Sequence, residues 1–128
     1  MADKVGTWKI GGVSIAGFSH LEEDIPCQDA HAFRIRDDGQ MIAAVADGAG
    51  SARLSHIGAQ AFVDTVVSRI YHQLSLEKFD PQRIASWIVT SVNETRDQLI
   101  RHGDDLQDGG PPSLSDFAAT LIVVVANL

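Results

Sequence analysis

The sequence lacks most of the features that would assign it to a specialised class of protein. Its single cysteine, Cys27, excludes an internal disulfide and is compatible with a reducing compartment. The N-terminal stretch MADKVGTWK has no apolar core of the kind found in secretory signals. The longest apolar segment, 117–126, is about half of the ~20 residues that a membrane-spanning helix needs. We therefore expect a cytoplasmic protein with no membrane partner.

Basic residues are also few: 10 Lys and Arg oppose 17 Asp and Glu, for a net charge of −7. Because the basic residues are scattered, we expect no nucleic-acid partner. The length of 128 residues fits one domain, 1–128, in which 1–6 is a leader and 104–116 is an exposed loop. No repeats or charge blocks divide it. An acidic surface instead suits a cation site.

The most informative stretch is 41–51, MIAAVADGAGS. Its first six residues predict a strand buried on both faces, and Asp47 is the first polar group after it. Gly48 and Gly50 let the backbone approach a ligand closely. Asp-Gly is also common turn chemistry, so the dipeptide alone does not distinguish a ligand site from a simple turn.

Around this stretch the patterns predict three strands, two helices and a last strand. The first strand begins near Thr7, and 31–36 alternates the apolar face of His31, Phe33 and Ile35 with a basic outer face. Residues 37–40 supply hairpin turn chemistry, so Met41 returns as the partner strand. This order favours an α+β fold with helices packed on an antiparallel sheet.

Both helices are predicted from spacing and capping residues. Ser55 is a plausible N-cap for a helix that ends near Leu74. Asp80 and Pro81 announce a second helix, and Gly103 lies where a glycine cap would end it. The run 117–128 is apolar on both faces, which is typical of a central strand.

Four landmarks in order point to a family: the Gln28-Asp29 pair, the VADGAG turn, GAQA at 58–61 and the strand AATLIVVV. Together they resemble the metal-dependent protein phosphatases of the PPM, or type 2C, family, particularly its bacterial branch. The likeness runs from 17 to 126 but covers only about the N-terminal half of a family domain. It implies a PPM phosphatase-like sandwich of two antiparallel β-sheets flanked by helices, of which the chain holds the part with order β-β-β-α-α-β.

The resemblance also implies a chemistry, in which two Mg²⁺ or Mn²⁺ ions activate a water that attacks the phosphorus of phosphoserine or phosphothreonine in a phosphoprotein substrate. Asp47 then corresponds to the ligand that bridges both metals, and Gly48 to the carbonyl that binds one. Gln28 and Asp29 match the pair beside the metals, so the catalytic residues are Asp47 and Asp29. Hard cations of this kind take carboxylate, carbonyl and water oxygens.

The sequence departs from the family pattern at three places. Many members carry a phosphate-gripping arginine shortly before the acidic pair; here His20 is the nearest substitute and Arg53 the next. Ala49 stands where some members place a proton-donating histidine. The family's remaining metal aspartates lie in the C-terminal half of its domain, and no such motif is found in these 128 residues.

Two carboxylates and one carbonyl are too few for two ions without many waters. We therefore expect a fragment or an incomplete relative, inactive or weak alone. A dimer or strand exchange through the apolar C-terminal strand is expected. Two alternatives remain open: a non-catalytic phosphatase-like module that binds a regulatory partner, and a piece that assembles with a partner chain.

Overall fold

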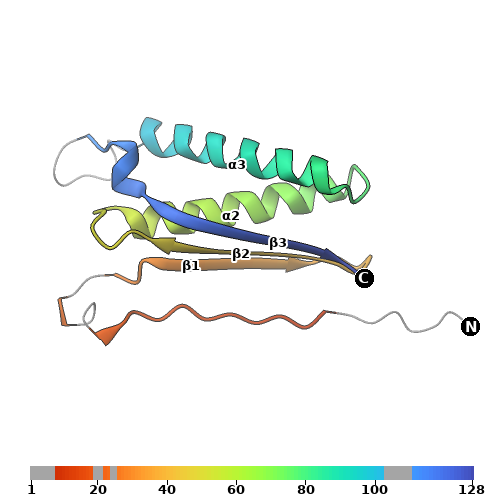
Figure 1. Ribbon diagram of the computed structural model, residues 1–128, viewed down its shortest axis with the longest axis horizontal. Coiled ribbons are helices and arrows are strands. Elements are labelled where there is room, and N and C mark those ends of the chain that lie inside the picture. Colours follow the sequence, from red (N-terminus) through yellow and green to blue (C-terminus); the bar gives the residue numbers. More distant parts are fainter. Residues whose placement is uncertain (1–7, 19–21, 24–25, 103–110) are drawn as a thin grey trace, which may run out of the picture.

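Three strands form one antiparallel sheet in the order β1-β2-β3 (Figure 1). The computed structural model describes residues 8–18, 22–23, 26–102 and 111–128. The strands are β1 (Asp29–Ile35), β2 (Gln40–Gly48) and β3 (Ala119–Asn127). The hairpin between β1 and β2 turns at Gly39, whose φ of 89° suits glycine. The element order β-β-α-α-β confirms the predicted α+β fold.

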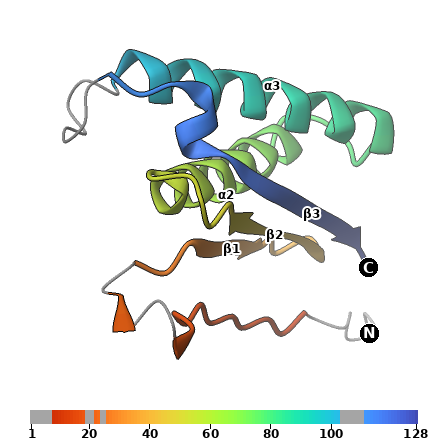
Figure 2. The ribbon, with the colours of Figure 1, turned by 60° about the vertical axis from the view of Figure 1, so that its left-hand side comes forward.

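Two helices cover one face of this sheet, as Figures 1 and 2 show: α2 (Ser55–Leu74) and α3 (Pro81–Arg101). Helix α2 begins and ends where its apolar spacing predicted. Its Val63, Val66 and Ile70 are fully buried and belong to one hydrophobic cluster with Ile42 of β2. This cluster supplies most of the core, because it is where the helix layer meets the sheet.

The helix ends confirm one capping prediction and overturn another. Asp80 caps α3, since its carboxylate accepts a hydrogen bond from the Gln82 backbone N–H at 2.9 Å. The N-cap of α2 is Leu54, not Ser55, so this helix has no side-chain capping hydrogen bond at its start. Ser55 is the first helical residue and is completely buried. The glycine cap predicted at Gly103 lies outside the described residues.

Strand β1 presents the opposite face to the helices from the one predicted. Arg36 lies on the helix side, where its guanidinium donates to the Tyr71 carbonyl oxygen at 2.9 Å. The Arg34 guanidinium lies 3.9 Å from the centre of the Tyr71 ring. Phe33 and Ile35 instead lie on the other face, 38% and 39% exposed. Long arginine stems can pack under a helix while their charged ends find carbonyl and aromatic partners, so alternation alone did not identify the buried face.

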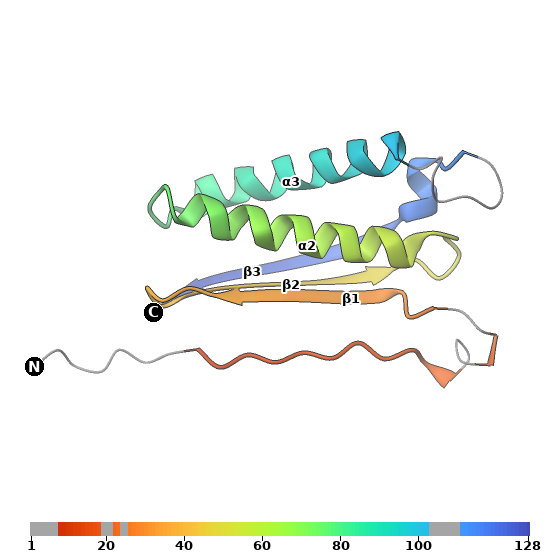
Figure 3. The same ribbon diagram turned by 180° about the vertical axis from the view of Figure 1, so that it is seen from behind.

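The strand predicted to begin near Thr7 does not form in the described residues that follow it. Residues 8–17 run as extended chain beside the sheet face opposite the helices, as Figures 1 and 3 show. Two side-chain hydrogen bonds attach them: Trp8 Nε1 donates to the Gly39 carbonyl oxygen at 2.9 Å, and Ser14 Oγ lies 2.8 Å from His31 Nδ1. A sandwich of two sheets stays a prediction.

Strands β2 and β3 are less buried than their apolar sequences predicted. On β2 the helix-side residues Ile42 and Ala44 are buried, whereas Val45 on the opposite face is 50% exposed. In the described sheet β3 is an edge strand, not a central one, and Ile122 is 63% exposed. The reason is that helices cover only one face. Self-association through β3 stays a prediction.

The end of the predicted exposed loop 104–116 is ordered into a turn. Leu114–Phe117 forms a short 3₁₀ helix, η2, which begins with a reciprocal capping box between Ser113 and Asp116. Phe117 is 2% exposed and packs with Leu54 and Leu99 in a second cluster. Residues 104–110 of that loop lie outside the residues that the structure describes. Among the described helices, none has the length and apolar character that crossing a membrane requires.

Candidate functional site

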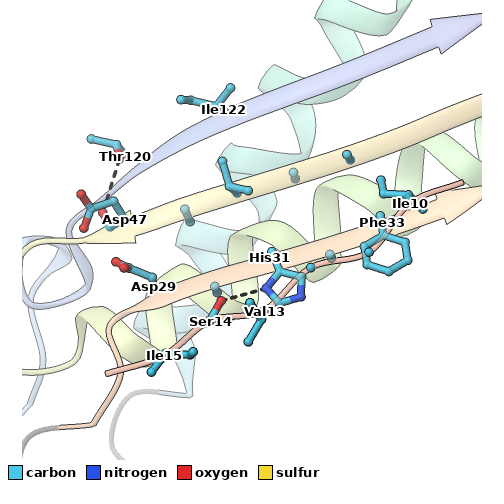
Figure 4. Close-up of a pocket in the computed structure, with 18 residues that line it drawn as sticks. Ile10, Val13, Ser14, Ile15, Asp29, His31, Phe33, Asp47, Thr120 and Ile122 are labelled. Atoms are coloured by element: carbon cyan, nitrogen blue, oxygen red, sulfur yellow. Dashed lines mark hydrogen bonds between the residues drawn. The ribbon is translucent and has the colours of Figure 1, made fainter. Parts of the chain in front are cut away.

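The predicted site lies at one end of the sheet, where β1 starts and β2 stops. Asp29 is the first residue of β1 and is paired directly with Asp47 of β2. Thr120 of β3 is paired with Asp47 on the other side, and its hydroxyl donates to the Asp47 carbonyl oxygen at 3.5 Å. Antiparallel pairing therefore brings two carboxylates from positions 18 apart in sequence to one sheet end. Figure 4 shows both carboxylates on the same face.

Beneath this pair the backbone of the Asp47-Gly48 turn packs closely against its neighbours. The Gly48 N–H donates to the Gln28 carbonyl oxygen at 3.1 Å. A Cβ added to Gly48 would lie 2.6 Å from that oxygen and 3.0 Å from Ser55 Oγ. Only glycine fits there without displacing backbone, so the sequence requirement at Gly48 is steric. Gln28 itself is 7% exposed.

The loop that follows Asp47 is held against η2 and the residue after it. The Ala49 N–H donates to the Ala118 carbonyl oxygen at 2.8 Å, and the Leu54 N–H donates to the Asp116 carbonyl oxygen at 2.9 Å. Arg53, within this loop, lies 3.4 Å from the Asp116 carboxylate. The loop thus has a defined position relative to β3, set by contacts that are distant in sequence.

Asp116 also provides a pH-dependent contribution to stability. The Ser113 backbone N–H donates to its carboxylate at 2.9 Å, and this bond, with the neighbouring Arg53 charge, lowers the pKa of Asp116 below its ordinary 3.8, although burial opposes the shift. A lowered pKa in the folded state means that the ionised form stabilises the fold above pH 3.8, and that this stabilisation is lost as the pH falls through the folded pKa.

We therefore expect Asp116→Asn to lower the melting temperature by a few degrees at pH 7. The difference from the wild type should shrink as the pH falls below 3.8 and should vanish once the pH is below the lowered pKa of Asp116 in the folded protein, where the wild-type carboxylate is also neutral. Thermal unfolding followed by circular dichroism from pH 7 to pH 3 measures this difference. Asp97→Asn, on the exposed surface of α3, is the control. If Asp116→Asn lowers the melting temperature by the same amount at every pH, the Asp116 charge does not stabilise the fold in the way described.

A cavity of about 440 Å³ lies between residues 10–15 and the sheet face opposite the helices (Figure 4). Its walls are mostly apolar, with Val13 and Ile15 on one side and Phe33, Val45 and Ile122 on the other. Asp29, Asp47 and Thr120 supply its polar end. The two carboxylates therefore lie at the polar end of a cavity whose other walls are mostly apolar.

Four of the predicted site residues come together at this end of the sheet: Gln28, Asp29, Asp47 and Gly48. Arg53 lies in the adjoining loop and shares its charge with Asp116. His20 lies outside the described residues. Sequence reasoning missed Thr120, although it is the only polar residue in the run 117–126, and that interruption was the available signal.

The donor set suits a hard divalent cation. Carboxylate oxygens from Asp29 and Asp47, with the Gly48 carbonyl oxygen, are ligands that Mg²⁺ and Mn²⁺ accept, and Mg²⁺ usually keeps several waters. No cluster of three or more His, Cys, Asp or Glu side chains suited to a metal occurs in the described ranges. The residues present therefore fit one largely hydrated cation better than two.

Fold and site together define an α+β protein whose antiparallel sheet ends in opposed carboxylates, an arrangement suited to metal-assisted chemistry. The family model for protein phosphatase 2C matches residues 16–127. The chain therefore belongs to the protein phosphatase 2C family, whose members are phosphatases and generally depend on metals. No curated protein shows significant similarity to it.

Proposed function

We propose that this protein is a Mg²⁺- or Mn²⁺-dependent phosphatase of phosphoserine and phosphothreonine proteins, with Asp47 and Asp29 as its metal-ligating and catalytic residues. The observation that carries the proposal is the direct pairing of Asp29 with Asp47 at the end of β1 and β2, in a chain of the protein phosphatase 2C family. A role in signalling and an origin in bacteria follow only from the resemblance.

The energetics of the paired carboxylates support a cation. Residues directly opposite on antiparallel strands have Cβ atoms roughly 4.5–5.5 Å apart, and like charges placed so are destabilising. The cost is offset if a divalent cation bridges the two side chains, because a cation between them turns repulsion into attraction. Opposed carboxylates of this kind are expected at a cation site.

Each residue of the site then has a distinct task. Asp29 and Asp47 would hold the cation with the Gly48 carbonyl oxygen, and buried Gln28 holds the turn from the helix side through its carbonyl oxygen. A cation there supplies Lewis acidity, which activates water and neutralises phosphoryl oxygens. Arg53 is placed to contact a substrate phosphate only if it leaves Asp116, so the competing pair would limit its contribution.

The first test is the dependence of activity on metal. Hydrolysis of a chromogenic aryl phosphate by the protein should appear on addition of Mn²⁺ or Mg²⁺ and disappear on addition of excess chelator. Ca²⁺, which prefers longer bonds and looser geometry, should support less turnover. The control is the protein with Asp29 and Asp47 both changed to Asn. Equal hydrolysis with and without chelator would refute the proposal.

A non-catalytic module remains the second candidate, and one observation favours it. The described part of the chain supplies two carboxylates at the site and no third acidic, cysteine or histidine ligand beside them. Such a protein would bind Mn²⁺ weakly or not at all and would not hydrolyse the phosphate ester. Calorimetric titration with Mn²⁺, run beside the activity assay, separates the two candidates, since only the enzyme combines binding with turnover.

A further inference from the structure

Ser55 is the most deeply buried polar side chain near the site. It is 0% exposed as the first residue of α2, and its backbone N–H donates to the Ala52 carbonyl oxygen at 3.2 Å. Its hydroxyl is buried and has no hydrogen-bond partner within the part of the chain that the structure describes. Buried hydroxyl groups are nearly always hydrogen-bonded, because a buried hydroxyl without a partner has lost its hydrogen bonds to water and has gained none within the protein. An alanine would avoid that cost.

The position of this hydroxyl connects it to the metal-binding turn. A Cβ added to Gly48 would lie 3.0 Å from both Cβ and Oγ of Ser55, and 2.6 Å from the Gln28 carbonyl oxygen. Ser55, Gly48 and Gln28 therefore meet at one point on the helix side of the sheet. The Asp47 side chain, one residue earlier, lies on the opposite face with the cavity. Ser55 can thus affect a cation only through the backbone of the turn.

The Gln28 carbonyl oxygen is an acceptor on the same side of the turn as this hydroxyl, since both atoms lie within about 3 Å of the point that a Cβ on Gly48 would occupy. It accepts a hydrogen bond from the Gly48 N–H at 3.1 Å, and a carbonyl oxygen has a second lone pair that can accept another. Asp29 follows Gln28 directly, so a bond to this carbonyl would also restrain the second carboxylate of the pair. A single hydroxyl would then hold the starts of both β1 and the Asp47-Gly48 turn.

We propose that Ser55 is a positioning residue of the metal site: its hydroxyl hydrogen-bonds to the Gln28 carbonyl oxygen when a divalent cation is bound. This inference rests on the proposed function. It goes beyond that function because it assigns a role in cation affinity to a side chain that lies on the other face of the sheet and touches neither cation nor substrate. Residues that orient metal ligands typically contribute 10- to 100-fold to metal affinity.

Titration of the protein with Mn²⁺ alone, in a calorimeter, tests the proposal. Ser55→Ala should raise the dissociation constant for Mn²⁺ by about 10-fold or more. Its melting temperature without metal should be unchanged or higher, since an unsatisfied buried hydroxyl has been removed. Ser55→Cys replaces the hydroxyl with a somewhat larger thiol, which is a weak donor, and should weaken binding as well. A side chain that merely filled space would show the reverse: a lower melting temperature and unchanged affinity.

Ser91 provides the matched control. It is 1% exposed in α3, and its hydroxyl donates to the Trp87 carbonyl oxygen at 2.7 Å. Ser91→Ala should leave the affinity for Mn²⁺ unchanged, because its hydroxyl bonds only within α3, far along the chain from the Asp47-Gly48 turn. Wild-type affinity in both Ser55 variants overturns the proposal for Ser55 and leaves the metal site intact. If the wild type itself binds no Mn²⁺, the proposed function fails, and the role of Ser55 fails with it.

Discussion

Replacing Asp47 with asparagine is expected to abolish metal-dependent turnover and to weaken Mn²⁺ binding by more than about 100-fold. The expected loss exceeds the 10- to 100-fold typical of residues that only orient ligands, because Asp47 is proposed to hold the cation itself. Asparagine keeps the shape of the side chain but removes its charge. The comparison therefore isolates electrostatic attraction to the cation.

The same substitution should leave the metal-free protein at least as stable. Asp47 is directly opposite Asp29, and like charges opposite each other on paired strands are destabilising, so removing one of them should not lower the stability of the metal-free fold. Weaker Mn²⁺ binding combined with an equal or higher melting temperature would separate loss of the site from loss of the fold. The measurements are Mn²⁺ calorimetry, thermal unfolding without metal, and hydrolysis of an aryl phosphate.

Asp37→Asn is the matched control, since Asp37 is an exposed aspartate in the turn at the other end of the same hairpin. It changes the net charge by the same amount and should leave Mn²⁺ affinity and turnover unchanged. If Asp47→Asn binds Mn²⁺ as tightly as the wild type, Asp47 is not a ligand. The proposed site would then be wrong even though membership of the family stands.

The second large effect is expected at Gly58, in the first turns of α2. A Cβ there would lie 2.4 Å from the Phe117 carbonyl oxygen and 3.0 Å from the Phe117 Cβ atom. Gly58→Ala should reduce the free energy of unfolding by about 1–3 kcal/mol, the usual range for overpacking a well-packed site. In an isolated helix the same change would stabilise the helix by about 1 kcal/mol. A loss of stability in the protein would therefore show that the added methyl group collides with Phe117 of η2.

Urea denaturation of Gly58→Ala and of the wild type measures this loss. Gly11→Ala is the control, because a Cβ at Gly11 meets no atom within 4 Å, and its effect should be close to zero. A shift of η2 should also disturb the loop that is hydrogen-bonded to residues 116 and 118, so the affinity for Mn²⁺ should fall in parallel. A Gly58→Ala protein that is as stable as the wild type would contradict this packing.

Local chemistry predicted the elements that short-range forces control. The apolar spacing of α2 was sufficient to predict where that helix begins and ends, and the Asp80-Pro81 pair was sufficient to predict the start of α3. Both signals are local, because helix periodicity and capping involve residues within one or two turns. The β1-β2 hairpin was predictable for the same reason: Gly39 sits in a short turn between two strands. These elements already bring Asp29 and Asp47 to the same end of a hairpin.

Contacts distant in sequence decided the rest. Which face of β1 is buried depended on Tyr71 of α2, whose ring and carbonyl oxygen receive two arginines. The burial of Ser55 depended on Gly48 and Gln28, since a residue that could cap a helix can equally be packed beneath a turn.

The sequence by itself therefore determined the helices and the hairpin, because those follow from period, capping and turn geometry, whereas the direct pairing of Asp29 with Asp47 was seen only in the structure. Only the tertiary structure decided what surrounds the carboxylates. It alone placed the apolar cavity on one side, the buried serine on the other and Arg53 against Asp116, because these contacts exist only once helix, sheet and loop have packed together.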